Sequence, residues 1–198
     1  MDTLAHTQHN ADSVLKNIFG YSEFRDGQKA VIDAALARQD SLVLLPTGGG
    51  KSLCYQVPAL VLDGITVVVS PLISLMQDQV AQLQALGVSA EFINNSVPRE
   101  QQHAIYQRVH DGDVKLLYVA PEKILQYEFI ERLHHLPVSL FAIDEAHCVS
   151  HWGHDFRPHY CRLSELKQHF PAIPMMALTA TADNATRYDI VNQLSLQN

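Results

Sequence analysis

The chain is predicted to adopt an α/β fold in which a mainly parallel β-sheet lies between two layers of helices. Six short apolar runs alternate with helical patterns along the 198 residues. A glycine-rich loop follows the first run, and an acidic pair follows the fifth. Strands that alternate with helices favour a parallel sheet, and such sheets bind ligands at the carboxyl ends of their strands. Both polar features should therefore meet at one edge of the sheet.

The predicted strands are short and rich in β-branched residues, as is typical of strands buried on both faces. They cover residues 42–45, 66–69, 90–93, 116–119, 140–143 and 175–178. Apolar residues at helical spacing predict helices at residues 72–86, 99–110, 123–134 and 184–194, and two more at residues 12–19 and 27–38. Residues 1–198 are expected to form a single domain with right-handed crossovers, and residues 1–10 are expected to be disordered.

A phosphate-binding loop is predicted directly after the first strand, where the chain reads Pro-Thr-Gly-Gly-Gly-Lys-Ser. Glycines let backbone N–H groups approach phosphates closely, and the helix that follows directs its free N–H groups at them. Lys51 can reach the β- and γ-phosphates, and the Ser52 hydroxyl can bind Mg²⁺. Leu45 stands where the usual motif has its first glycine. The residues predicted to contact the nucleotide here are Thr47, Gly48, Gly49, Gly50, Lys51 and Ser52.

An acidic pair follows the fifth predicted strand, in the sequence Asp144-Glu145-Ala146-His147. Hydrolysis of a triphosphate needs one carboxylate to hold Mg²⁺ through water and a second to orient the attacking water. Asp144 fits the first role and Glu145 the second. Alone, the pair could equally be a solvated cap of the next helix. The phosphate loop favours the catalytic interpretation, because each feature predicts the other.

The phosphate loop and the Asp-Glu-Ala-His box together resemble superfamily 2 helicases, and further segments are similar to the RecQ family. These segments are residues 19–28 (adenine recognition), 69–79 (motif Ia), 118–122 (motif Ib), 148–158 (an aromatic-rich loop) and 178–182 (motif III). Their order and spacing match over nearly the whole chain. His151 replaces the glutamine usual in the aromatic-rich loop.

The resemblance implies a three-layer RecA-like domain, the first motor domain of a bacterial 3′ to 5′ DNA helicase that acts in recombination and repair. It implies ATP and Mg²⁺ as cofactors, with Lys51, Asp144 and Glu145 as catalytic residues. The expected partners are single-stranded and forked DNA and a second motor domain, while zinc-binding, winged-helix and C-terminal domains would lie beyond this chain. A monomer is expected in the bacterial cytoplasm at the nucleoid, without membrane contact.

Residues near the N-terminus are candidates for adenine recognition. The Gln28 amide can pair with the adenine edge, and Tyr21 and Arg25 can stack on the base. Composition alone would favour a polar helix start with a core tyrosine. The family resemblance of the whole segment supports the adenine interpretation.

The segment that follows the acidic pair is a candidate for contact with DNA. Aromatic rings and a guanidinium can stack on the bases of a single strand. Trp152 and Phe156 could instead form one face of a core helix, although Gly153 and Pro158 disfavour a regular helix. The residues predicted to bind DNA or couple it to hydrolysis are His147, Trp152, His154, Phe156, Arg157, Ser70 and Pro71.

The composition limits these interpretations. The formal net charge of −7 is unusual for a DNA-binding domain, since phosphate neutralisation supplies much of the affinity. We therefore expect weak DNA binding by this chain alone. No apolar run approaches membrane-spanning length, and residues 1–10 do not resemble a signal peptide. The three cysteines are expected to be reduced thiols.

No zinc is expected in this chain. The cysteine and histidine spacing between residues 148 and 161 matches no standard zinc motif.

Two other functions remain open from the residues themselves. An RNA helicase can carry the same Asp-Glu-Ala-His box, although residues 21–28 and the aromatic-rich loop argue against it. The other is a module that binds nucleotide without hydrolysing it. Helicases of this superfamily take the transition-state arginine from a second motor domain, and this chain would lack that arginine. Such arginines contribute about 10³–10⁵ in rate in related systems.

Overall fold

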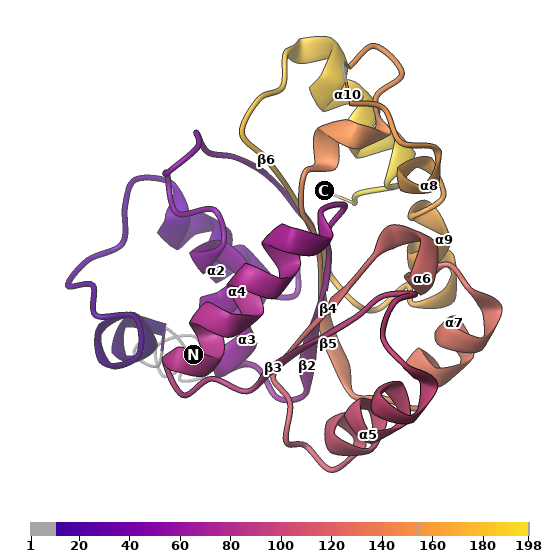
Figure 1. The fold of residues 1–198 in the computed structure, drawn as a ribbon. Coiled ribbons are helices and arrows are strands. Elements are labelled where there is room, and N and C mark those ends of the chain that lie inside the picture. Colours follow the sequence, from indigo (N-terminus) through magenta and orange to yellow (C-terminus); the bar gives the residue numbers. More distant parts are fainter. Residues whose placement is uncertain (1–10, 154, 198) are drawn as a thin grey trace.

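A parallel β-sheet forms the centre of the computed structural model, which describes residues 11–153 and 155–197 (Figure 1). Its strands are β1 (Ser41–Leu44), β2 (Ile65–Val69), β3 (Ala90–Ile93), β4 (Leu116–Val119), β5 (Val138–Ile143) and β6 (Met175–Thr179). They lie in the order β1-β6-β5-β2-β4-β3, and each neighbouring pair is parallel. The α/β fold is confirmed, and the predicted strands lie within one residue or two of those observed.

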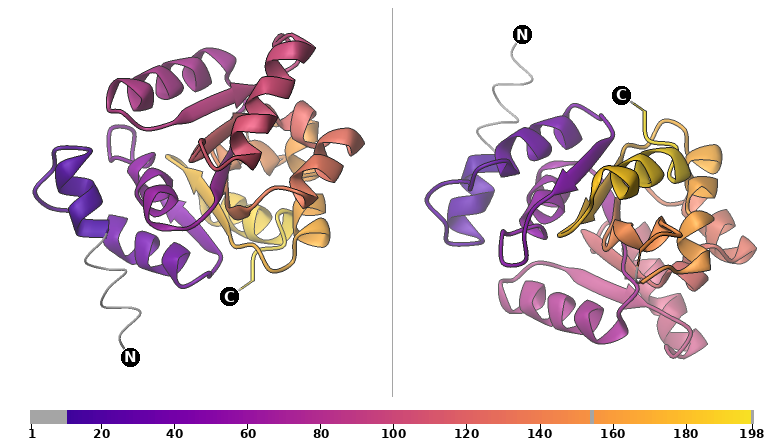
Figure 2. Two further views of the ribbon diagram at one scale, coloured as in Figure 1. Left: turned by 90° about the horizontal axis from the view of Figure 1, so that it is seen from below. Right: turned by 90° about the horizontal axis from the view of Figure 1, so that it is seen from above.

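Helices cover both faces of this sheet, which gives three layers (Figures 1 and 2). One face packs against α2 (Gln28–Leu36), α3 (Leu53–Val61) and α4 (Ile73–Ala85). The other packs against α5 (Arg99–His110), α7 (Tyr127–His134), α9 (Ser164–His169) and α10 (Asn184–Gln193). Residues alternate between the faces along each strand. In β2, Val68 contacts the first group of helices, whereas Val67 and Val69 contact the second.

The N-terminal part of the described chain is helical over residues 11–17. Its Ala11 and Leu15 pack against Ile32 of α2 and Val57 of α3. This helix therefore extends the first helical layer beyond the edge strand β1. The predictions made for residues 1–10 fall outside the described residues.

Two parts of the chain differ from the sequence prediction. The helix expected at residues 123–134 is divided into α6 (Pro121–Ile124) and α7, because Gln126 adopts an extended backbone between them. Between β5 and β6 the chain forms the 3-10 helix η1 (Ala146–Val149), α8 (Pro158–Cys161) and α9, none of which was predicted. Helices this short give no periodic pattern that the sequence could show.

Asp40 connects the amino ends of β1 and β6. Its carboxylate lies 2.6 Å from Lys167 Nζ and accepts hydrogen bonds from the N–H groups of Met175 and Gln197, each at 2.8 Å. The Lys167 and Asp40 side chains are 9% and 4% exposed. The described residues contain no helix that is long and apolar enough to cross a membrane.

Candidate functional site

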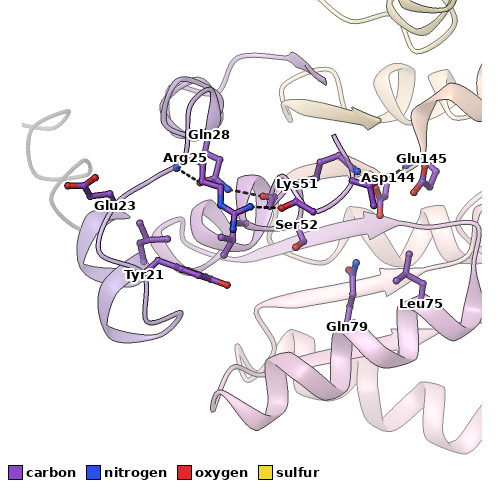
Figure 3. Close-up of a pocket in the computed structure, with 15 residues that line it drawn as sticks. Tyr21, Glu23, Arg25, Gln28, Lys51, Ser52, Leu75, Gln79, Asp144 and Glu145 are labelled. Atoms are coloured by element: carbon purple, nitrogen blue, oxygen red, sulfur yellow. Dashed lines mark hydrogen bonds between the residues drawn. The ribbon is translucent and has the colours of Figure 1, made fainter. Parts of the chain in front are cut away.

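A pocket of about 380 Å³ lies at the carboxyl ends of β1 and β5 (Figure 3). Tyr21, Arg25 and Gln28 lie at one end, Asp144 and Glu145 lie at the other, and the phosphate loop lies between them. The residues that line the pocket are Leu15, Tyr21, Glu23, Arg25, Gln28, Thr47, Gly48, Gly50, Lys51, Ser52, Leu53, Leu75, Gln79, Asp144 and Glu145. The fold thus brings together residues that are up to 130 positions apart in the sequence, since 145 − 15 = 130.

The phosphate loop has the backbone geometry that its glycines make possible. Gly48 and Gly50 have φ values of +77° and +76°, in the left-handed region that favours glycine. A Cβ at Gly49 would lie 2.8 Å from the carbonyl oxygen of Pro46. Ser52 is the N-cap of α3, so the amino end of this helix faces the pocket beside Lys51. An anion bound there would face both the helix dipole and an ammonium group.

Gln28 holds the phosphate loop by its side chain. Its Nε2 donates to the carbonyl oxygens of Gly50 at 3.0 Å and Gly49 at 3.4 Å, and its Oε1 accepts from the Arg25 N–H at 2.8 Å. The Arg25 guanidinium in turn donates to the Gly48 carbonyl. Gln28 is 1% exposed. Its amide therefore contacts the loop in this structure, and the expected contact with adenine stays a prediction.

Asp144 is a buried carboxyl group at the end of β5, with 6% of its surface exposed. Burial, and secondarily the charge of Glu145, raises its pKa to about 6. The hydroxyl of the buried Tyr160 donates to the Asp144 carbonyl oxygen at 2.8 Å. The Asp144 N–H donates to the Val69 carbonyl oxygen at 2.9 Å. These bonds fix the backbone at the point where the carboxyl group enters the pocket.

Glu145 has an unusual backbone conformation, with a φ of +51°. A residue other than glycine in this region is strained, and such residues cluster at functional sites. The turn starts η1 and places His147 Nδ1 3.3 Å from Glu145 Oε2 and 2.9 Å from Thr179 Oγ1. His147 therefore connects the acidic pair with the end of β6.

The aromatic-rich loop begins buried within η1 and reaches the surface at Trp152. Trp152 is 83% exposed, which excludes the alternative that it packs in a core helix. Phe156 stacks on His151 with ring centroids 4.1 Å apart, and Arg157 Nε lies 3.5 Å from Asp155 Oδ1. This exposed indole is a suitable surface for a nucleic-acid base. His154 lies outside the described residues.

The remaining DNA candidates lie at the end of β2. Ser70 is 2% exposed, and its N–H donates to the carbonyl oxygen of Val119 at 3.2 Å. Pro71 follows it at the surface and is partly exposed. These positions do not by themselves show contact with a nucleic acid, so the DNA contacts expected of Ser70, Pro71, Phe156 and Arg157 stay predictions.

Several residues at the site were not anticipated. Gln79 of α4 lines the pocket, and its Oε1 accepts from the Tyr55 hydroxyl at 2.8 Å. Glu23, Leu75 and Tyr160 were missed as well. Glu23, Leu75 and Gln79 lie within the segments at residues 19–28 and 69–79 that resemble family motifs, but no pattern singles out these side chains. Tyr160 reaches Asp144 only because α8 packs beside the end of β5.

Comparisons with known proteins agree with this geometry. The DEAD/DEAH box helicase family matches residues 25–190. The chain is 57% identical to the ATP-dependent DNA helicase RecQ of Haemophilus influenzae, over 94% of this chain and 30% of that protein. It is 54% identical to the protein of the same name from Pasteurella multocida, over 96% of this chain and 30% of that protein. The chain thus spans about a third of the length of these relatives.

Solved structures support the fold. The Pyrococcus furiosus Hef helicase domain has a TM-score of 0.65 at 19% identity, over 88% of this chain and 37% of that chain. The DUF1998 helicase MrfA bound to DNA has a TM-score of 0.73 at 19% identity, over 94% of this chain and 28% of that chain. The family match includes both the phosphate loop and the acidic pair, and these meet in one pocket. The chain therefore belongs to the DEAD/DEAH box helicase family.

Proposed function

We propose that the chain is the ATP-binding first motor domain of a RecQ-type DNA helicase that moves 3′ to 5′ in DNA recombination and repair. The observation that carries this proposal is the single pocket in which the phosphate loop faces Asp144 and Glu145. The high identity to RecQ proteins over almost the entire chain supports DNA rather than RNA as the nucleic acid.

The pocket residues fit a Mg²⁺–triphosphate complex. The Ser52 hydroxyl and the Asp144 carboxylate are hard oxygen donors that line the same pocket, and Mg²⁺ prefers such donors. When bound, Mg²⁺ would offset the negative charge of the phosphates. Lys51 would contact the β- and γ-phosphates, Asp144 would help to hold the metal, and Glu145 would orient the attacking water.

The aromatic-rich loop can report DNA binding to this pocket. Oδ2 of Asp155, in the loop, lies 3.9 Å from Nε2 of His147. The other ring nitrogen of His147, Nδ1, contacts Glu145 and Thr179. A base that stacks on Trp152 would shift this loop, and the shift would reach Glu145 through His147. Hydrolysis would then depend on DNA.

The complete enzyme needs more than this chain. Because the relatives are about three times longer, we propose that a second motor domain supplies the transition-state arginine and part of the DNA track. Single-stranded and forked DNA are the proposed substrates, and the nucleoid of a bacterial cytoplasm is the proposed location. The chain is proposed to be monomeric and to hydrolyse little ATP by itself.

The test compares the 198-residue chain with the longer protein that contains it. Phosphate release is measured with and without single-stranded DNA, and unwinding is measured on substrates with 3′ or 5′ tails. We expect DNA-stimulated hydrolysis and unwinding from a 3′ tail in the longer protein only. Lys51→Ala should abolish both and serves as the contamination control. Equal turnover by the short chain, or stimulation by RNA alone, would contradict the proposal.

A further inference from the structure

His147, Cys148 and Asp155 form a cluster of potential metal ligands outside the proposed Mg²⁺ site, and the proposed function uses His147 and Asp155 only to pass a movement of the loop to Glu145. One atom from each, a ring nitrogen, the thiol sulfur and a carboxylate oxygen, lie within 4.8 Å of one another. Cys148 Sγ is 3.6 Å from Asp155 Oδ2, and His147 Nε2 is 3.9 Å from the same oxygen. Ligand atoms of one tetrahedral ion lie about 3.3–3.8 Å apart at metal–ligand distances of about 2.0–2.3 Å, so the separations of 3.6 Å and 3.9 Å need at most a small closing movement.

The neighbours of two of these ligands favour metal binding as well. With Nε2 bound to a metal, the neutral imidazole carries its proton on Nδ1, which lies 2.9 Å from Thr179 Oγ1 and 3.3 Å from Glu145 Oε2. Thr179 Oγ1 can accept a hydrogen bond from this N–H, because its own hydroxyl donates to the Thr181 carbonyl oxygen at 3.1 Å. The second oxygen of Asp155 lies 3.5 Å from Arg157 Nε. Outer partners of this kind orient histidine and carboxylate ligands in metal sites.

Although the sequence spacing predicts no zinc in this chain, the spatial cluster includes a carboxylate that this spacing does not consider. We propose that His147 Nε2, Cys148 Sγ and Asp155 Oδ2 form a Zn²⁺ site that holds the aromatic-rich loop against η1. The set of one nitrogen, one sulfur and one oxygen suits Zn²⁺, whereas Mg²⁺ avoids thiolates. Binding replaces the thiol proton, which leaves to solvent, by a sulfur–metal bond. The His147 and Asp155 side chains are 23% and 53% exposed, so solvent can supply a fourth ligand.

The consequence is inhibition by zinc rather than a requirement for it. Two of the ligands belong to η1 and the third to the loop that carries Trp152. A bound ion would keep the loop in the position described here. Hydrolysis stimulated by DNA should therefore fall, a consequence that rests on the proposed function, whereas the binding site itself does not.

The binding test uses Co²⁺ as a spectroscopic substitute for Zn²⁺ on the 198-residue chain. We expect one tightly bound ion with a thiolate-to-cobalt charge-transfer band that Zn²⁺ abolishes and excess Mg²⁺ does not. Cys148→Ala should remove the band, and Asp155→Asn should weaken binding by about tenfold or more. Cys161→Ala is the matched control and should keep the band. Circular dichroism verifies that each variant is folded, and the exposed position of Asp155 makes its variant informative even where Cys148→Ala unfolds.

The results separate the site from its effect. A band that survives Cys148→Ala and Asp155→Asn, or that disappears in Cys161→Ala, would overturn the site. The second measurement is the ratio of DNA-stimulated hydrolysis by the longer protein with and without Zn²⁺. Zinc should lower this ratio in the unaltered protein and in Cys161→Ala, but not in Cys148→Ala. Binding without any change in that ratio would overturn the inhibition, and absence of stimulation in every sample would instead overturn the proposed function.

Discussion

Asp144 shows how a single residue can favour function over stability. In the proposed function its carboxyl group must be ionised to hold Mg²⁺, yet it is 6% exposed and its pKa is raised to about 6. Removing a charge from water without a full partner is costly. The fold therefore bears a buried negative charge at neutral pH, and the metal–nucleotide complex would compensate for it.

The first prediction is that Asp144→Asn stabilises the protein at neutral pH. The pKa is 3.8 for the ordinary carboxyl and about 6 in the fold. Because the folded value is higher, the contribution of Asp144 to stability is favourable below pH 3.8 and is lost as the pH rises through about 6. Asp144→Asn should raise the free energy of unfolding by on the order of 1–3 kcal/mol above that range.

Urea unfolding on either side of this pH range provides the measurement. The increase in the free energy of unfolding caused by Asp144→Asn should vanish in acid, where the native carboxyl group is protonated and uncharged like the amide. Asp63→Asn, at an exposed position, is the control. A loss of stability at neutral pH would mean that the charge of Asp144 is compensated within the fold.

Gln28 leads to a second prediction at the same scale. Gln28→Ala should weaken binding of every triphosphate, because the carbonyl oxygens of Gly49 and Gly50 lose their donor. The affinity for ATP should fall more than that for GTP if the amide also contacts adenine, as the family resemblance implies. Titration of a fluorescent analogue followed by competition with ATP and GTP measures both effects. Equal losses would limit Gln28 to supporting the loop, and unchanged affinities would deny it any role.

At the scale of elements, the exposed loop between η1 and α8 connects the nucleotide pocket with the surface. The third prediction is that Trp152→Ala leaves the free energy of unfolding within about 0.5 kcal/mol, as for most surface substitutions. In the longer protein it should abolish most of the stimulation by DNA while basal hydrolysis persists. Tyr127→Ala, which removes another exposed aromatic ring, is the control. Full stimulation in Trp152→Ala would exclude the indole from coupling.

The pair formed by Asp40 and Lys167 leads to the fourth prediction. It connects α9 with β1, and Asp40 also accepts from the first residue of β6. Asp40→Ala leaves the Lys167 ammonium without a counter-charge and with only the Ile173 carbonyl oxygen, at 3.2 Å, as an acceptor, so the free energy of unfolding should fall by about 3–5 kcal/mol. Denaturation by urea measures this fall, and the double variant with Lys167→Met should recover much of it. A fall below 1 kcal/mol would show that water compensates the ammonium group.

The sequence predicts elements whose pattern is local and misses those set by packing. The six strands and the phosphate loop are recognisable because apolar runs and glycines mark them directly. η1, α8 and α9 were missed because helices of four to six residues have no periodicity. Two hydrogen bonds of the site join segments that are distant in the sequence, from Gln28 to the phosphate loop and from Tyr160 to Asp144. The sequence could not predict them, because they depend on the three-dimensional arrangement.

For the whole molecule, net charge is the property that most limits function. The chain carries a formal charge of −7, so long-range attraction to a polyanion is absent. The fifth prediction is that the 198-residue chain binds single-stranded DNA weakly and loses this binding as salt rises. Fluorescence anisotropy over a range of salt concentrations tests it, with the longer protein as the comparison. Tight binding that is independent of salt would show that stacking dominates.

The order of the strands also has a consequence for synthesis of the chain. Among the described residues, β1 pairs with β6 alone, and β6 lies between β1 and β5 although it comes last of the six strands in the sequence. During synthesis, β1 and the phosphate loop that follows it therefore have no paired strand until residues 175–179 have left the ribosome. A nascent chain that ends before β6 contains both halves of the proposed ATP site but lacks the strand that lies between β1 and β5. The ability to bind ATP should therefore appear in one late step of synthesis. Removal of β6 from the finished domain should likewise abolish nucleotide binding.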